Sequence, residues 1–228
     1  MLLAMTRIMV PFSFAGETFK ATADGALFWP VQSALLVADL HLEKASWFAR
    51  FGQFLPPYDS HATLVALSAE VERTGATRLY CLGDSFHDQF GCDRLQSGAR
   101  ELLCGLTSKL DWTWIVGNHD PGFADHCGGR IEEEVEIGGI ILRHEALREE
   151  PRHEISGHYH PKLRLNLCGR RVSRRCFVTS ATKTIMPAFG SLTGGLDAHH
   201  PEILGSVGGK AAALVPVSDR LLRFPLAA

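Results

Sequence analysis

Three apolar segments of similar length recur in the first half of the chain. They cover residues 34–38, 78–82 and 112–116, and polar or turn-forming residues follow each of them. Apolar segments of this length are typical of strands that are buried on both faces, as in parallel sheets. The stretches between them carry apolar residues three and four positions apart, which predicts amphipathic helices. The pattern therefore predicts strand, helix, strand, helix, strand, the alternation of an α/β fold.

Local signals set the ends of the two predicted helices. The apolar faces consist of Leu64, Leu67 and Val71 in the first helix and of Leu95, Leu102, Leu103 and Leu106 in the second. The first helix should begin at Asp59 or Ser60, either of which can cap its N-terminus, and should end at Gly75. The second should begin at Asp93 and end before the strand at Trp112.

Paired strand segments flank this α/β unit on both sides. The pairs are residues 19–22 with 26–29, 133–137 with 140–144, and 163–167 with 172–179. Turn formers such as Asp24-Gly25 and Gly138-Gly139 separate the members of a pair, so each pair is predicted to form a hairpin. The second half should therefore form a mainly antiparallel sheet that packs on the first sheet. Because no linker or repeat interrupts the chain, we predict a single domain over residues 1–228.

Composition and net charge are those of an ordinary globular protein. Hydrophobic residues make up 46% and charged residues 21% of the chain, and the formal net charge is −2. This average charge predicts no general attraction to nucleic acid or to acidic membranes. The six cysteines form no CxxC pair and have no recurrent spacing. No export signal or membrane-spanning stretch is found, so we expect a cytoplasmic protein that does not bind membranes.

One segment departs from this balance of charge. Between Ile155 and Leu196 there is no acidic residue, but there are seven basic ones: Lys162, Arg164, Arg170, Arg171, Arg174, Arg175 and Lys183. If the arginines flank a hairpin turn, they would form a positive rim that can follow a phosphate backbone without reading its sequence. The alternative is a set of solvated arginines on an exposed antiparallel face.

Side chains that can bind metal or move protons follow the predicted strands. They are Asp39 and His41 after the first strand, Asp84 after the second, Asn118, His119 and Asp120 after the third, and His144, His158 and His160 near the ends of later strands. If the first strand continues, Asp39 and His41 point to the same side of it, because side chains alternate along a strand. Since α/β sheets place their ligands at the carboxyl ends of strands, we expect a functional site there.

Seven of these side chains suit a pair of metal ions. They are Asp39, His41, Asp84, Asn118, His144, His158 and His160. Seven ligands are too many for one tetrahedral zinc. Oxygen and imidazole donors suit two adjacent Mn, Fe or Zn ions that share a carboxylate. Two such ions lie about 3.5–4 Å apart in hydrolases of phosphate esters.

Five motifs, taken in order, resemble those of the calcineurin-like metallophosphoesterases. They are Asp39-x-His41, Gly83-Asp84, Gly117-Asn118-His119-Asp120, the single His144, and Gly157-His158-x-His160, within a span from about Leu36 to Thr182. The resemblance implies a sandwich of two mixed β-sheets with helices on the outside. It also implies hydrolysis of a phosphodiester by a hydroxide that bridges two divalent metals. The chain departs from the family after the bridging aspartate, where relatives carry GDxxD or GDxVDR and this chain has GDSFHD over residues 83–88.

The same resemblance implies a role for each candidate residue. The first metal would be bound by Asp39, His41 and His160, the second by Asn118, His144 and His158, and Asp84 would bridge the two. His119 would stabilise the attacked phosphate and protonate the leaving oxygen, with Asp120 as its orienting partner. Manganese is the expected metal, with iron or zinc as alternatives.

Longer matches resemble the PdeM subgroup, whose members are described as ligase-associated DNA-damage-response phosphodiesterases or endonucleases. The matches lie at residues 39–44, 52–59, 83–88, 187–190 and 193–196. The resemblance implies a DNA substrate and a role in DNA repair. It also implies functional association with an ATP-dependent DNA ligase, a helicase and an exonuclease.

Other interpretations stay open at this point. The enzyme could be a diesterase or pyrophosphatase that acts on small nucleotides, or the chain could be a non-catalytic scaffold on the same fold. Scaffolds of that kind normally lose ligands, whereas this chain retains all seven as well as His119. His158-x-His160 could be a solvated pair on a surface strand, and His144 could end such a strand. No role is assigned to His87, Asp88, His199 and His200.

Overall fold

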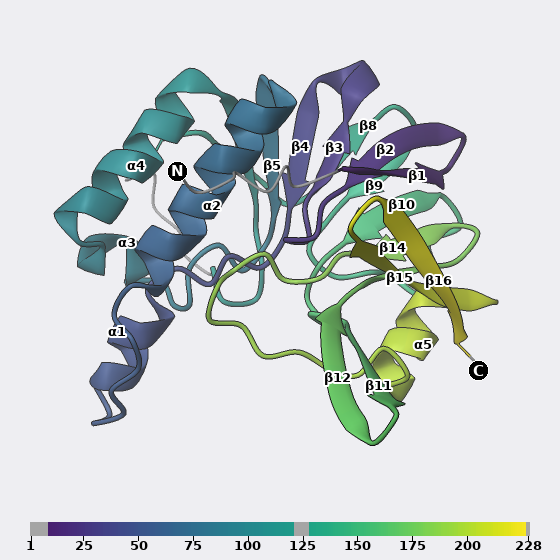
Figure 1. The fold of residues 1–228 in the computed structure, drawn as a ribbon. Helices are drawn as coiled ribbons and strands as arrows, with labels where there is room; N and C mark the ends of the chain where they lie inside the picture. Colours follow the sequence, from purple (N-terminus) through teal and green to yellow (C-terminus); the bar gives the residue numbers. More distant parts are fainter. Residues whose placement is uncertain (1–8, 121–127, 227–228) are drawn as a thin grey trace, which may run out of the picture.

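Two seven-stranded β-sheets lie face to face in the computed structural model of the chain, which describes residues 9–120 and 128–226 (Figure 1). Helices α2 (Asp59–Thr74) and α4 (Ser97–Lys109) pack on the outer face of the first sheet, and α5 (Pro201–Val207) packs on that of the second. The predicted α/β sandwich is therefore confirmed. The prediction of a single domain over residues 1–228 stays a prediction.

The first sheet follows the order of the chain. Its strands are β1 (Val10–Phe14), β2 (Glu17–Ala21), β3 (Leu27–Trp29), β4 (Ala34–Val37), β5 (Arg78–Leu82), β6 (Asp111–Ile115) and β7 (Arg130–Glu132). Strands β1 to β4 pair antiparallel, and β4 to β7 pair parallel. The three apolar segments thus form the parallel centre of the sheet, where both faces are covered.

The second sheet is mixed. Its order is β16 (Arg220–Leu226), β15 (Ala211–Val217), β13 (Phe177–Thr179), β14 (Lys183–Ile185), β10 (His153–Ser156), β9 (Ile140–Leu142) and β8 (Val135–Ile137). The predicted hairpin at Gly138-Gly139 is confirmed as β8 and β9. Most neighbours are antiparallel, as expected, but β10 runs parallel to both β9 and β14. This parallel pairing matters for the site, because it brings the carboxyl ends of β9 and β10 to one edge.

Of the two predicted helices, the first is found and the second is divided into two shorter helices. Helix α2 ends at Gly75, which has a φ of +65°, as predicted. No side chain caps its N-terminus, because the Asp59 carboxylate instead accepts a hydrogen bond from Ala45 N–H at 3.0 Å. The helix predicted from Asp93 is broken at Leu95, where φ is −53° and ψ is 126°, into α3 (Gly91–Arg94) and α4. The remaining helices are η1 (Pro30–Gln32) and α1 (Lys44–Ala49).

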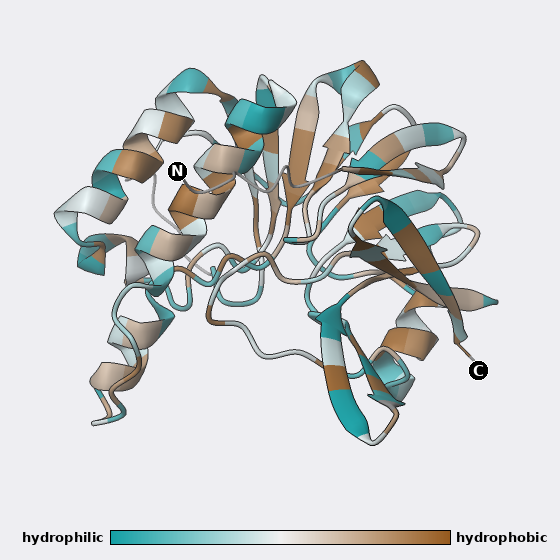
Figure 2. Cartoon of the chain, in the orientation of Figure 1, coloured by the Kyte–Doolittle hydropathy of each residue, from teal (hydrophilic) through white to brown (hydrophobic). Residues whose placement is uncertain are grey.

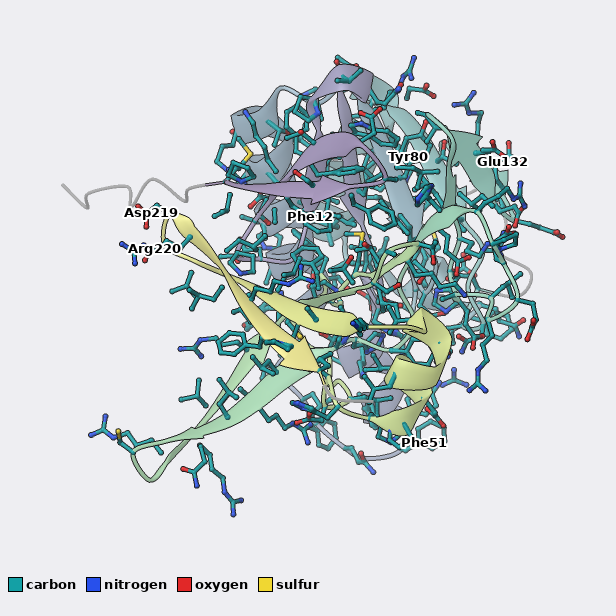
Figure 3. The ribbon with its side chains drawn as sticks, turned by 90° about the vertical axis from the view of Figure 1, so that its right-hand side faces the viewer. Phe12, Phe51, Tyr80, Glu132, Asp219 and Arg220 are labelled. Atoms are coloured by element: carbon teal, nitrogen blue, oxygen red, sulfur yellow. The ribbon has the colours of Figure 1, made fainter. Side chains whose placement is uncertain are left out.

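A separate two-stranded hairpin projects from the sandwich. Strands β11 (Lys162–Leu167) and β12 (Arg170–Arg175) pair antiparallel around Cys168-Gly169, as predicted. Figures 1 and 3 both show this hairpin extending away from the body. The strand predicted over residues 172–179 is divided, because β12 ends at Arg175 and β13 belongs to the second sheet.

The core has a layer on each face of each sheet. In β4, Leu35 and Val37 pack against the helices, whereas Ala34 and Leu36 pack against the second sheet. Side chains alternate along a strand, so a strand that serves both layers must be apolar throughout. Figure 2 accordingly shows brown, hydrophobic strands in the centre of the molecule. Phe12 lies in the layer between the sheets (Figure 3). Within residues 9–120 and 128–226, no helix has the length and apolar character needed to cross a bilayer.

Candidate metal centre

The candidate side chains gather where strands of the two sheets end. Asp39 and His41 follow β4, Asp84 follows β5, Asn118 follows β6, His144 follows β9, and His158 and His160 follow β10. Parallel pairing of β4, β5 and β6 in one sheet, and of β9 and β10 in the other, places these ends at shared edges. Segments more than a hundred residues apart in the sequence thus meet at one place.

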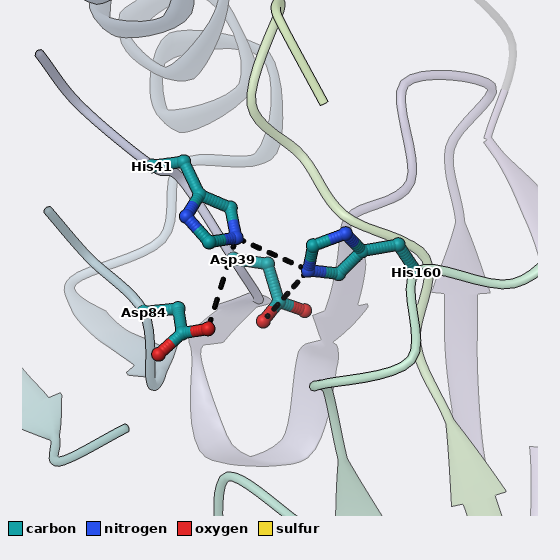
Figure 4. A group of neighbouring side chains, drawn as sticks. All are labelled: Asp39, His41, Asp84 and His160. Atoms are coloured by element: carbon teal, nitrogen blue, oxygen red, sulfur yellow. Dashed lines mark hydrogen bonds and ion pairs between the residues drawn. The ribbon is translucent and has the colours of Figure 1, made fainter. Parts of the chain in front are cut away.

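Four side chains form the first group (Figure 4). They are Asp39, His41, Asp84 and His160, and one donor atom from each lies within 4.8 Å of the others. The Nε2 atoms of His41 and His160 are 3.2 Å apart, and His160 Nε2 is 3.3 Å from Asp39 Oδ1. Asp39 is fully buried, and the two imidazoles have little exposure. Buried nitrogens and oxygens that converge in this way make a cation site of mixed N and O donors.

Three side chains form a second group around Asp84. The Asn118 Oδ1 atom lies 2.8 Å from His144 Nε2 and 3.0 Å from His158 Nδ1. The two ring nitrogens are themselves 3.0 Å apart. Asp84, His144 and His158 also have donor atoms within 4.8 Å of one another. All seven predicted ligands are therefore brought together by the fold.

Asp84 lies between the two groups. Its Oδ2 atom is 3.7 Å from His41 Nε2, whereas its Oδ1 atom is 3.5 Å from His144 Nε2. Oδ1 also accepts a hydrogen bond from the His119 N–H at 2.9 Å. The side chain is only 3% exposed. One carboxylate thus presents an oxygen to each group, which is the arrangement that a shared ligand requires.

Backbone strain is concentrated at these residues. Five of the ten non-glycine residues with positive φ in the described part of the chain are predicted ligands: Asp39, His41, Asp84, His158 and His160. The first strand does not continue through Asp39 and His41, because β4 ends at Val37 and the two residues have φ values of 53° and 45°. Left-handed conformations cost about 1–2 kcal/mol per residue. Strain of this kind collects at functional sites, where the surrounding structure compensates for it.

Glycines in the motifs leave room for the ligands. A Cβ atom at Gly83 would overlap with the His144 ring, and one at Gly117 would overlap with Asp84. A Cβ atom at Gly157 would lie 2.6 Å from Asp39 Oδ2. In each case the glycine precedes one ligand in sequence and makes space for a ligand from another strand end. The glycines of the motifs are therefore part of the site.

Protonation of the imidazoles suits metal binding. Burial, followed by repulsion from His160, lowers the pKa of His41 to about 2, so this ring is neutral at neutral pH. Burial and then His144 lower the pKa of His158. His144 Nδ1 lies 3.1 Å from the Leu82 carbonyl oxygen. A carbonyl oxygen can only accept, so in the tautomer with the proton on Nδ1 the ring donates to Leu82 and offers the Nε2 lone pair to a metal.

The structure corrects the predicted role of Asp120. His119 Nδ1 lies 3.0 Å from the carbonyl oxygen of His87, not beside a carboxylate. Asp120 instead accepts hydrogen bonds from the N–H groups of Gly117, Ser85 and Phe86 at 3.1–3.2 Å. Burial raises its pKa to about 6, although these N–H donors act in the opposite direction. Asp120 therefore ties the loops after β5 and β6 together, and the His87 carbonyl orients the His119 ring.

The structure also shows the surroundings of the four residues to which the sequence assigned no role. The ring of His87 stacks on that of His119, with centroids 5.3 Å apart and an interplanar angle of 17°. Asp88 forms an ion pair with Arg94 at 2.7 Å. His200 accepts a hydrogen bond from the Glu202 N–H and so caps α5, while His199 is exposed. His87 thus adjoins the candidate metal centre, and it lies in the GDSFHD segment, close in sequence to Asp84.

The chain was compared with family models, curated proteins and solved structures. Neither a family model nor a curated protein matches the sequence. The solved structure of Pseudomonas putida nuclease MPE matches with a TM-score of 0.74 and 25% identity, covering 94% of this chain and 98% of that chain. The chain has the metallophosphoesterase fold and is related to nuclease MPE. The resemblance to metallophosphoesterases is thus confirmed.

Two further solved structures match with lower scores. The phosphoesterase Yfce from E. coli has a TM-score of 0.43 and 13% identity, covering 85% of this chain and 99% of that chain. A protein of Streptococcus pneumoniae described as a predicted phosphoesterase has a TM-score of 0.32 and 14% identity, covering 79% of this chain and 80% of that chain.

Proposed function

We propose that the protein is a phosphodiesterase that uses two divalent metal ions. Asp39, His41 and His160 would hold the first ion, Asn118, His144 and His158 the second, and Asp84 would contact both. The position of Asp84 carries the proposal, since its two oxygens face separate groups of donors. The donor set consists of oxygens and imidazoles, which fits manganese, iron or zinc, and we expect manganese.

The reaction assigned to this site is hydrolysis. When bound, the two cations would lower the pKa of a water molecule and neutralise the phosphate oxygens. A bond forms between the water oxygen and phosphorus while the bond to the leaving oxygen breaks. His119 Nδ1 is occupied by the His87 carbonyl, so Nε2 is the atom that can donate a proton to the leaving oxygen. The same carbonyl holds the orientation of the His119 ring for that transfer.

Nucleic acid is the substrate class that the surface favours. Arg164, Arg170, Arg171 and Arg174 of the β11–β12 hairpin are exposed, and the hairpin begins two residues after His160. Arg164 and Arg174 donate to backbone carbonyls rather than to carboxylates, so their charge is available to phosphates. The likeness to a protein named a nuclease supports the same substrate. Such a hairpin has little use on a small nucleotide, which favours DNA over the small-molecule alternative.

A cellular role follows from the PdeM resemblance alone. We propose that the protein acts in DNA repair in the cytoplasm, in functional association with an ATP-dependent DNA ligase, a helicase and an exonuclease. Co-purification from a cell lysate tests whether these proteins associate directly. The lysate is treated with nuclease so that DNA cannot bridge them, and an Asp84→Ala chain serves as a second bait.

Hydrolysis of bis-p-nitrophenyl phosphate and of single-stranded DNA with added Mn²⁺ tests the activity. We expect His119→Ala to lower kcat on DNA by about two to four orders of magnitude, because the leaving oxygen loses its proton donor. The loss on bis-p-nitrophenyl phosphate should be smaller, because p-nitrophenolate leaves without being protonated. The metal content of that variant, measured by elemental analysis, should equal that of the unaltered protein. Absence of turnover with Mn²⁺, Fe²⁺ and Zn²⁺ on both substrates would reject the proposed function. Loss of metal from His119→Ala would instead reject only the role given to the imidazole.

A further inference from the structure

Aromatic side chains are concentrated next to the metal centre. Helix α1 begins three residues after His41, and Trp47, Phe48, Phe51 and Phe54 lie within it or in the loop that follows. Phe51 is 63% exposed and Phe54 is 86% exposed. Figure 1 shows α1 at the lower left, outside the layers of the sandwich. These rings are therefore not needed to fill the main core, and the two that lie within α1, Trp47 and Phe48, contact His87 beside the metal centre.

A series of stacked rings leads from this helix to the proposed proton donor. The rings of Phe48 and His87 have centroids 5.8 Å apart and an interplanar angle of 21°. His87 in turn stacks on His119 at 5.3 Å and 17°. Trp47 meets the His87 ring edge-on, with centroids 4.8 Å apart and an angle of 81°. The three nearly parallel rings are thus held in position by a fourth.

A cavity of about 570 Å³ opens along these rings. It is lined by Trp47, Phe48, His87, Asp88, Gln89, Asn118 and His119. Aromatic rings are thus prominent in its lining, and Gln89 and Asn118 contribute amide groups that can form hydrogen bonds. Two of the lining residues, Asn118 and His119, also belong to the metal centre. A molecule in this cavity is therefore adjacent to the reacting phosphate.

We propose that this cavity binds the base of a nucleotide that flanks the scissile phosphodiester. The proposal rests on the proposed function, because it requires a phosphodiester at the metal centre. A flat base suits aromatic walls, and stacking is tolerant of sequence because every base has a π-face. A base is joined to its phosphate by one sugar, so the occupant of a cavity next to His119 is the neighbouring nucleotide. Phe48 is thus a substrate-binding residue, and unstacked single strands are the preferred form of the substrate.

An abasic residue tests the cavity on the unaltered protein. A labelled oligothymidylate with one central abasic residue is digested by the Mn²⁺-loaded protein, and the products are resolved at single-nucleotide length. Cleavage at one of the two phosphodiesters beside the abasic residue should fall about 5- to 100-fold relative to the same bond in the unmodified strand. Bonds elsewhere in the strand should be cut at unchanged rates. Equal cleavage of all bonds would overturn the proposal.

Substitution of Phe48 tests whether this residue makes the contact with the base. Phe48→Ala should slow cleavage of the unmodified strand and reduce the penalty at the abasic residue to less than twofold, since both changes remove the same contact. Phe54→Ala, which removes an exposed ring that does not line the cavity, should keep the pattern of the unaltered protein. Retention of the full abasic penalty in Phe48→Ala would contradict the assignment.

Failure of the base pocket can be told apart from failure of the proposed function. If the unaltered protein hydrolyses bis-p-nitrophenyl phosphate but cuts no bond of the oligothymidylate, the base pocket is rejected and the phosphodiesterase stands. If neither compound is hydrolysed with any of the three metals, the function and the pocket are both rejected.

Discussion

At the scale of single residues, the candidate metal centre depends on side chains held in uncommon backbone conformations. Asp39, His41 and Asp84 all have positive φ and are almost fully buried. Such conformations are costly for residues other than glycine, and they cluster at functional sites. Because of these turns the donor atoms converge on one site, whereas an extended strand would have spread them along its length. Strain and function are therefore linked at the same residues.

Asp84→Ala should empty both halves of the centre. The variant removes the one carboxylate that faces both groups, so we expect elemental analysis to find much less than two ions per chain. Asp111→Ala is the matched control, because Asp111 is an exposed carboxylate paired with Arg130 at 2.7 Å. Two retained ions in the Asp84 variant would contradict its place between the metals.

Two glycine variants distinguish the effect of steric overlap with a ligand from the effect of backbone strain alone. Gly75 and Gly83 have φ values of +65° and +74°, but only at Gly83 would a new Cβ atom meet a neighbour, the His144 ring. Both alanine variants should lose about 1–2 kcal/mol of stability in urea unfolding. Gly83→Ala should in addition lose metal from the group that contains His144. Equal metal content in the two variants would show that the His144 ring can move aside.

At the scale of elements, strand direction decides where the chemistry lies. The carboxyl ends of β4, β5 and β6 meet at one edge, and the ends of β9 and β10 meet it from the other sheet. Each loop that follows carries at least one donor. Helix α1 and the β11–β12 hairpin follow two of these loops directly, so the segments proposed to bind substrate begin next to the proposed metal ligands.

Loss of charge on the hairpin should weaken DNA binding in a salt-dependent way. Arg170 and Arg171 are exposed on β12, and each proposed phosphate contact releases counterions. Replacing both with alanine should reduce the slope of log K against log salt by about 1.4 for single-stranded DNA, from two contacts of about 0.7 each. Fluorescence anisotropy at several salt concentrations measures this slope.

The matched control for this change is Arg152→Ala. Arg152 is also exposed, but its guanidinium already pairs with Glu136 and Glu150, so its loss should leave the slope unchanged. An unaltered slope in the Arg170 and Arg171 variant would mean that the hairpin does not contact the phosphate backbone.

At the scale of the whole molecule, the centre joins the two sheets. The first sheet supplies Asp39 and Asp84, the second supplies His144 and His158, and the His158 N–H donates to Asp39 Oδ2 at 3.1 Å. Ions bound between these loops would therefore stabilise the packing of one sheet on the other. Binding to the folded chain alone stabilises it by mass action.

Removal of metal should lower the melting temperature. For ions present at about a hundred times their dissociation constant the loss is about 2.7 kcal/mol per site, which corresponds to roughly 5–10 °C for a chain of this size. Calorimetry before and after EDTA, with Mn²⁺ added back, measures the shift. The Asp84→Ala variant should show little further change with EDTA. A melting temperature that is unaffected by EDTA in the unaltered protein would argue against ions between the sheets.

The order of motifs and the period of apolar residues made much of this molecule predictable. Both are local properties: a strand buried on two faces must be apolar throughout, as in β4, and a helix ends where Gly75 permits a left-handed turn. The seven donors could be named because each follows a strand or hairpin signal. The C-terminal strands β15 and β16 and helix α5 were not predicted, and the second helix was wrongly given as unbroken.

Only the tertiary structure decided how these parts work together. The sequence alone determined the α/β sandwich, the residue types of the site and the position of the basic hairpin. The fold decided that Asp120 binds backbone N–H groups while a carbonyl of His87 orients His119. It also decided that rings from α1 stack towards the centre. The reason is physical: periodicity and turn residues report local conformation, whereas contacts between segments far apart depend on the packing of the whole chain.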